Sequence, residues 1–181
     1  MDYAVVVYFD KDDDLYISRI MKNICHAGVN PYMLDLCIRP HITLAMFKDT
    51  NPQEFSKWLH TYASEIDCFN IKFSSIGAFT TNPSVLFLAP VMEEGFFNLH
   101  MRFNVQIKEV ASTFENYYLP GSWVPHCTLA TSLSQNELHL ALDVVVDDFK
   151  PFAVTVTQIG FVQCNPFKEI ITYEIGKQVN L

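Results

Sequence analysis

Two copies of one short motif carry the residues of this chain that are best suited to acid–base chemistry. Residues 40–45 read PHITLA and residues 125–130 read PHCTLA, in a chain with six histidines in all. Two imidazoles that face one cavity can take a proton from a nucleophile and give one to a leaving oxygen. Threonine hydroxyls beside them can donate hydrogen bonds to phosphate oxygens as charge develops. The motifs therefore predict phosphodiester chemistry at four residues: His41, Thr43, His126 and Thr128.

A metal site is the main chemical alternative for these histidines. Zinc normally takes three or four His, Cys or carboxylate ligands, and threonine is a poor substitute. Neither an H-E-x-x-H motif nor a carboxylate cluster accompanies the two motifs. We therefore expect no metal and no cofactor.

The sequence of each motif predicts a strand, because proline restricts the preceding residue to extended conformations. Side chains alternate between the two faces of a strand. One face of each motif should then carry the imidazole, the hydroxyl and a small residue, as in a strand that lines a cavity. The predicted sets are His41, Thr43 and Ala45 against Ile42, Leu44 and Met46, and His126, Thr128 and Ala130 against Cys127, Leu129 and Thr131.

A second repeated motif indicates that the two histidine motifs belong to an internal repeat. Residues 76–83 read IGAFTTNP and residues 159–166 read IGFVQCNP, so that Gly77 and Gly160 follow the two histidines at nearly equal spacing. Two shared motifs in one order predict a duplication with pseudo-two-fold symmetry. The two histidines would then meet in the cleft between two lobes, where binding sites tend to occur.

The remaining sequence predicts helices and strands in an α+β arrangement. Strands are expected at 3–9, at 69–79 with 85–91 as a hairpin, and as two closing strands. Helices are expected to begin at the acidic run DKDDD, at the cap Asn51-Pro52 and at a capping box of Ser134 and Glu137, and a further helix is expected over about 92–115. We predict one bilobal domain over residues 1–181, with two mostly antiparallel sheets flanked by helices around a central groove.

Composition narrows the possible partners. Half of the residues are apolar and the formal net charge is −8, which suits a packed core and repels a long nucleic-acid duplex. No run approaches the roughly 20 apolar residues of a membrane span, and no signal peptide is recognisable. The five cysteines form no C-x-x-C pair, and we expect buried free thiols. A cytoplasmic monomer is the expectation.

The duplicated H-x-T motifs, one in each half of the chain, resemble the signature of the 2H phosphoesterase superfamily. Its LigT-like members are known as 2′–5′ RNA ligases or cyclic phosphodiesterases. The resemblance implies a bilobal fold around a water-filled groove, with His41 and His126 as the acid–base pair and Thr43 and Thr128 as ligands of phosphate oxygens. It implies that a 2′,3′-cyclic phosphate is opened to a 2′-phosphate, or a 2′–5′ linkage cleaved, without metal.

Further residues are candidates for substrate binding, each with a structural alternative. Arg39 could contact the substrate or be a solvated loop residue, and Trp123 could stack on a base or pack on its own lobe. Ser132 continues the predicted face of His126, and Tyr8 could line the groove or lie in the core. No cation follows the second motif closely, which favours a small nucleotide or a short RNA end.

Two other classes of function remain open at this point. The fold could be a catalytically idle module that binds nucleotides, or the repeats could be core strands of an interaction protein.

Overall fold

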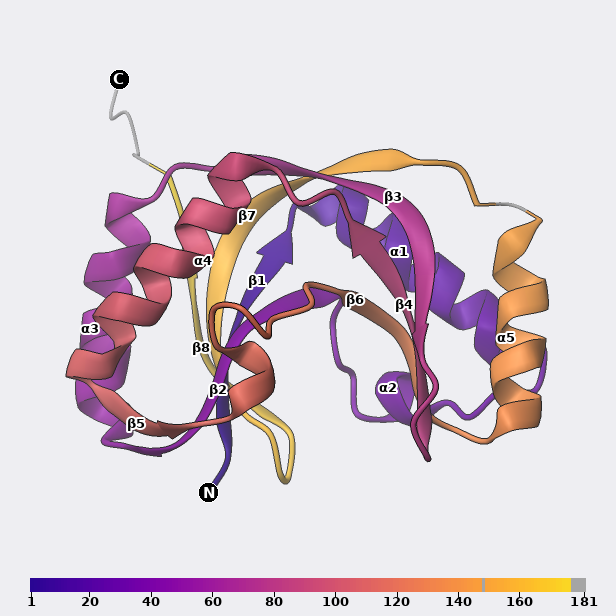
Figure 1. The fold of residues 1–181 in the computed structure, drawn as a ribbon, viewed down its shortest axis with the longest axis horizontal. Helices are drawn as coiled ribbons and strands as arrows, with labels where there is room; N and C mark the ends of the chain where they lie inside the picture. The colour runs from indigo at the N-terminus through magenta and orange to yellow at the C-terminus, as the bar shows by residue number, and fades with distance from the viewer. Residues whose placement is uncertain (148, 177–181) are drawn as a thin grey trace.

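The computed structural model describes residues 1–147 and 149–176 and shows a mixed α+β fold (Figure 1). Its strands are β1 (Tyr3–Phe9), β2 (His41–Thr50), β3 (Phe69–Phe79), β4 (Ser84–Pro90), β5 (Ala111–Phe114), β6 (Cys127–Leu133), β7 (Phe152–Gln163) and β8 (Lys168–Glu174). Its helices are α1 (Lys11–His26), α2 (Tyr32–Asp35), α3 (Pro52–Glu65), α4 (Glu94–Gln106) and α5 (Gln135–Val146), with 3₁₀ turns η1 (Ile107–Glu109) and η2 (Asn116–Tyr118).

The strands form one eight-stranded antiparallel sheet in the order β1-β2-β6-β4-β3-β7-β8, with β5 on β2. A further pairing of β1 with β7 closes six of the strands into a ring. The strands expected in two sheets are thus joined, through β2–β6 and through β3–β7. The α+β class is confirmed.

Side-chain caps start the main helices where the sequence predicts them. The Asp10 carboxylate accepts hydrogen bonds from the backbone of Asp12 and Asp13 at the start of α1. The Ser134 hydroxyl and the Glu137 carboxylate form the predicted capping box of α5. These bonds satisfy backbone donors that the first helical turn leaves unpaired.

The helices cover one face of the sheet in two groups. Figure 1 shows α3 and α4 on one side of the molecule and α1, α2 and α5 on the other. Their apolar stripes meet the sheet in one large core, which includes Ile17, Phe55, Phe103 and Ala141. None of the helices in the described ranges is both long and apolar enough to cross a bilayer.

The helix predicted over about 92–115 is shorter than expected. Helix α4 ends at Gln106, and the segment then turns through η1 into strand β5. This strand pairs with the outer end of β2, where Ser112 lies opposite Asp49 and Phe114 opposite Phe47. The edge of β2 offers backbone partners that a longer helix could not use, so that tertiary pairing overrides the local pattern.

The pairing of β3 with β7 has the register expected for two related halves. Phe69 lies opposite Val156, and Phe73 lies opposite Phe152. Moving each residue by the 83 positions that separate Gly77 from Gly160 exchanges one pair for the other. The register is consistent with the predicted pseudo-two-fold axis, while duplication itself stays a prediction.

Candidate active site

The two histidines and two threonines meet where β2 pairs with β6. The pairing joins Ile42 to Cys127, which hold the same position in the two motifs. Because the strands are antiparallel, each histidine lies beside the threonine of the other motif: His41 beside Thr128, and His126 beside Thr43. The four side chains form one crossed set, to which both halves contribute equally.

These four side chains lie on the face of the sheet opposite the helices. In the register of β1 with β2, Tyr8 is opposite His41 and Val6 is opposite Thr43. Tyr8 and Val6 belong to a second, smaller cluster of buried residues, separate from the core beneath the helices. All four predicted residues are partly exposed, so that a ligand can reach them.

A β-bulge interrupts each motif at the same position. The register of β1 with β2 shifts so that Val5 faces Ala45 and Val6 faces Thr43. The register of β4 with β6 shifts in the same way, so that Leu86 faces Ala130 and Phe87 faces Thr128. A bulge places two consecutive residues against one partner residue. As a result Leu44 and Ala45, and likewise Leu129 and Ala130, all pack in the main core.

The predicted alternation of side chains between the two faces of each motif therefore holds up to Thr43 and Thr128 and fails beyond them. Ala45 and Ala130 were expected beside the hydroxyls and instead lie in the core, whereas Met46 packs against the Tyr8 cluster on the other face. The same bulge breaks the alternation that placed Ser132 on the face of His126. Ser132 has a left-handed backbone (φ 60°) and its carbonyl accepts from the Asn30 amide at 3.5 Å. Its role in substrate binding stays a prediction.

Identical hydrogen bonds orient the two imidazoles. The Nδ1 atom of His41 lies 2.7 Å from the carbonyl oxygen of Arg39, and Nδ1 of His126 lies 2.7 Å from that of Val124. A carbonyl can only accept, so Nδ1 carries the proton in each neutral ring. Nε2 is then the basic nitrogen in both rings. Each motif thus presents one nitrogen that can gain or lose a proton during a reaction.

Both imidazoles have pKa values below the ordinary value for histidine. Burial lowers the pKa of His126, and the bond to Val124 opposes this in part. Burial also lowers the pKa of His41, and the charges of His126 and Arg39 lower it further. The two rings come from neighbouring strands whose pairing at Ile42 and Cys127 brings the motifs together.

The repeated Ile-Gly pairs make room for aromatic rings beneath the site. A Cβ atom at Gly77 would lie 2.4 Å from the Phe87 ring, and one at Gly160 would lie 2.6 Å from the Tyr8 ring. Neither approach is possible for a residue with a side chain. Packing of a ring over the backbone thus explains why glycine occupies both positions.

Arg39 and Tyr8 form a polar group next to His41. The Arg39 guanidinium lies 4.3 Å above the Tyr8 ring, and its Nη2 donates to the Gln158 side chain at 3.2 Å. The Tyr8 hydroxyl donates to Glu169 at 3.1 Å. Tyr8 is 1% exposed, so its ring supports neighbouring groups rather than offering a free surface. Sequence reasoning did not single out Gln158 or Glu169, which lie in the last two strands.

Trp123 packs against its own surroundings. Its indole N–H donates to the carbonyl of Thr43 at 3.0 Å, and its ring stacks on His100 at 3.7 Å with an interplanar angle of 6°. These contacts tie the loop before the second motif to the strand of the first. Stacking of Trp123 on a base stays a prediction. His100 was not among the candidates, although its spacing from Phe96 and Phe103 places it on the buried face of α4.

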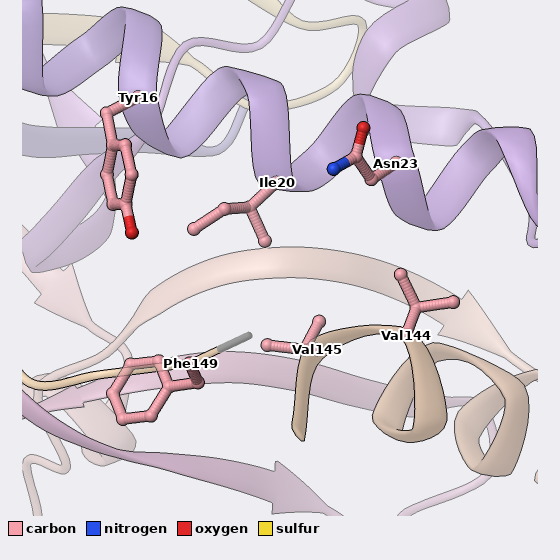
Figure 2. Close-up of a pocket in the computed structure, with 6 residues that line it drawn as sticks. All are labelled: Tyr16, Ile20, Asn23, Val144, Val145 and Phe149. Carbon is pink, nitrogen blue, oxygen red and sulfur yellow. The ribbon is translucent and has the colours of Figure 1, made fainter. Parts of the chain in front are cut away.

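The pockets of the described chain differ in their relation to this site. Figure 2 shows a cavity of about 50 Å³ between α1 and α5, lined by Tyr16, Ile20, Asn23, Val144, Val145 and Phe149. It is far smaller than typical ligand pockets and belongs to the helical face of the sheet. A pocket of about 350 Å³ is lined in part by Arg39, two residues before His41. No three His, Cys, Asp or Glu side chains gather as a metal site among residues 1–147 and 149–176.

Comparison with known proteins agrees with this geometry. Residues 29–165 match the family model described as the 2′-5′ RNA ligase superfamily. No curated protein was found to match the chain. Similar solved structures include TT0787 of Thermus thermophilus (TM-score 0.61, 15% identity, covering 98% of this chain and 100% of that one). A second is E. coli LigT complexed with 3′-AMP (TM-score 0.56, 15% identity, covering 97% of this chain and 98% of that one). A third is Kluyveromyces marxianus Usb1 (TM-score 0.52, 10% identity, covering 96% of this chain and 98% of that one). The expected family is confirmed, and these structures show the same fold.

Proposed function

We propose, since the chain belongs to the 2′-5′ RNA ligase superfamily of 2H phosphoesterases, that it hydrolyses a phosphodiester without a metal ion. The substrate is a 2′,3′-cyclic phosphate or a 2′–5′ linkage of a small nucleotide or short RNA end. The site lies between the two halves of the chain. The observation that carries the proposal is the matched pair of imidazoles, each held at Nδ1 by a backbone carbonyl and each basic at Nε2.

The crossed set supplies each part of an in-line displacement. One imidazole takes a proton from water as its oxygen bonds to phosphorus. The bond from phosphorus to the 3′ oxygen breaks, and the other imidazole, protonated at the outset, gives its proton to that oxygen. Thr43 and Thr128 donate hydrogen bonds to the non-bridging oxygens as negative charge builds on them. The product carries a 2′-phosphate and a free 3′-hydroxyl.

The ligands in related structures support a small nucleotide as the substrate. E. coli LigT has been crystallised with 3′-AMP, with NADP⁺ and with ATP. The net charge of −8 also favours a ligand with few phosphates over a long polyanion.

Turnover of 2′,3′-cyclic nucleotides in excess EDTA tests this function. We expect turnover by the wild type, and a loss of about 10²- to 10⁴-fold in His41→Ala and in His126→Ala. The double variant should lose little more than either single one, because acid and base act in one step. His139→Ala, on the exposed side of α5, is the matched control and should retain full activity.

The other results of this experiment distinguish the alternatives. Turnover that EDTA abolishes would restore the metal mechanism. Full activity in both histidine variants would disprove the residue assignment. Nucleotide binding without turnover by any form would identify an idle binding module instead of an enzyme.

A further inference from the structure

The Arg39 side chain is fixed on two edges and one face. Its Nε lies 3.6 Å from the Asp14 carboxylate and its Nη2 donates to Gln158 at 3.2 Å. The Tyr8 ring covers one face of the guanidinium at 4.3 Å, a cation–π geometry. These contacts hold the plane of the group in one orientation. They also occupy donors that a free arginine would offer to a phosphate.

The remaining side of the guanidinium faces a pocket. Arg39 lines a pocket of about 350 Å³ together with Thr157, Gln158 and Glu174, and Tyr8 is not among the lining residues. The Arg39 side chain retains 35% of its exposure. Its uncovered face is therefore the part that a ligand in this pocket would meet. The pocket is at the lower end of the size range of small-molecule sites.

The pocket lies next to the proposed catalytic site. The carbonyl of Arg39 holds Nδ1 of His41, so that the backbone of one residue serves the imidazole while its side chain lines the pocket. The Tyr8 ring links the two, since it lies 6.1 Å from the His41 ring and beneath the guanidinium. Arg39 is the residue that the pocket and the surroundings of His41 share, so on the proposed function a group next to the reacting phosphate would lie on the Arg39 side of the site.

The charges around the pocket favour an uncharged group over a second phosphate. Three carboxylates, of Asp10, Asp14 and Glu174, line it with two cations, of Lys11 and Arg39. Glu169 adds a further negative charge where it accepts from Tyr8. A phosphate brought here would meet this excess of negative charge and an arginine already paired with Asp14 and Gln158.

We propose that this pocket binds the nucleoside moiety of the substrate, with its base stacked on the Arg39 guanidinium, and that its carboxylates discriminate against a second phosphate on that nucleoside. Arginine planes stack on unpaired bases because both are flat and polarisable. The proposal rests on the proposed function for the position of the first phosphate. It adds the substrate class: nucleosides that carry one phosphate group, at the bond that reacts.

Calorimetric titration with adenosine 2′-monophosphate and adenosine 2′,5′-bisphosphate tests the proposal, since binding is measured independently of turnover. Arg39→Lys keeps the charge and removes the flat stacking surface. We expect it to weaken binding of the monophosphate about tenfold, within the range of a lost base stack. Arg19→Lys, an arginine on the outer side of α1 that lies over Tyr16, is the matched control and should bind as the wild type does.

The bisphosphate tests the charge argument. The wild type should bind it several-fold more weakly than the monophosphate, and Glu174→Gln should narrow that difference. Circular dichroism and thermal melting confirm that each variant is folded.

Three results would overturn the proposal: wild-type protein that does not bind the monophosphate, unchanged binding in folded Arg39→Lys, or bisphosphate binding as tight as that of the monophosphate. The outcome is separable from that of the proposed function. Binding as expected without turnover of cyclic nucleotides would refute the enzyme and leave the nucleoside pocket, whereas turnover with unaltered Arg39→Lys binding would refute the pocket alone.

Discussion

The surroundings of the two proposed catalytic histidines differ, although their hydrogen bonds are the same. His41 lies beside a polar group in which Tyr8 donates to Glu169, and Arg39 donates to Gln158. His126 packs against two aromatic rings, those of Phe79 at 5.0 Å and Phe87 at 5.2 Å. One half of the site therefore carries fixed charge, and the other is lined by two aromatic rings.

This difference teaches how two equivalent side chains can take unequal roles. Aromatic surroundings disfavour a proton on His126 through loss of hydration, whereas the positive charge of Arg39 additionally disfavours a proton on His41. When the pair holds one proton, the charge of Arg39 directs it toward His126. We therefore propose that the base lies in the His41 half and the acid in the His126 half.

The threonines test whether both halves contribute to the transition state. Thr43→Val and Thr128→Val retain a strand-forming shape and remove one hydroxyl each. We expect each to lower kcat about 10²-fold, the usual cost of one lost donor to a developing oxyanion. Steady-state kinetics on a 2′,3′-cyclic nucleotide measure this. Thr61→Val, on the exposed side of α3, is the control; kcat values equal to the wild type in both variants would show that the crossed set is not the catalytic centre.

Alanine substitutions at Gly77 and Gly160 measure how tightly each half of the site is packed. We expect Gly160→Ala to lower the free energy of unfolding by about 1–3 kcal/mol, because its methyl group would meet Tyr8 as well as Val6 and Thr172. Gly77→Ala should cost less, since the three nearest contacts of its methyl group all belong to one side chain, the Phe87 ring. Urea denaturation gives both values. A larger loss at Gly77 would mean that the aromatic half is the more rigid one.

The indole of Trp123 connects the loop of one half to a strand of the other. Trp123→Phe removes the donor to the Thr43 carbonyl and keeps most of the stacking on His100. A loss of about 1 kcal/mol in the free energy of unfolding is expected. Substrate KM should stay unchanged if the ring has only a packing role. A large rise in KM with unchanged stability would instead favour the sequence-based prediction that Trp123 stacks on a base.

The dependence of stability on pH gives the smallest effect. The pKa values of His41, His126 and His100 are lower in the folded chain than the ordinary histidine pKa of 6.5. Around and below pH 6.5 the unfolded chain therefore binds more protons than the folded chain does. Stability should then fall as the pH drops from about 7.5 through 6.5 toward the lower folded pKa values. His41→Asn should flatten this slope more than His126→Asn, because Arg39 lowers the pKa of His41 in addition to burial. Urea midpoints at about pH 7.5 and 5.5 measure the slope, and equal slopes in the two variants would contradict the assigned asymmetry.

Sequence patterns predicted the features that follow local rules better than the features that depend on pairing with distant strands. The motifs, the paired glycines and the capping box could be read because each rests on local rules of strands, turns and helix starts. The bulges at Leu44 and Leu129 could not, since a strict alternation gives no sign of an extra residue. Strand β5 could not be predicted for another reason. Its local sequence is compatible with a helix, and it forms a strand because it pairs with the edge of β2.

The polar surroundings of His41 were equally hidden from the sequence. Arg39 adjoins the first motif and could be proposed, but Asp14, Gln158 and Glu169 come from distant segments that only the fold brings together. His100 carried a usable signal, its place on the apolar stripe of α4. Long-range contacts of single residues are thus where the sequence alone was insufficient.

The crossed pairing at Ile42 and Cys127 makes each half of the chain dependent on the other. A chain of half this length would hold one histidine and one threonine, and it would complete a site only by meeting a second copy. On the predicted duplication, joining two copies would replace that encounter with an effective concentration set by the linking segment. A fused chain is also free to vary one copy alone, which is the condition for Arg39 and Phe79 to stand beside otherwise equivalent histidines.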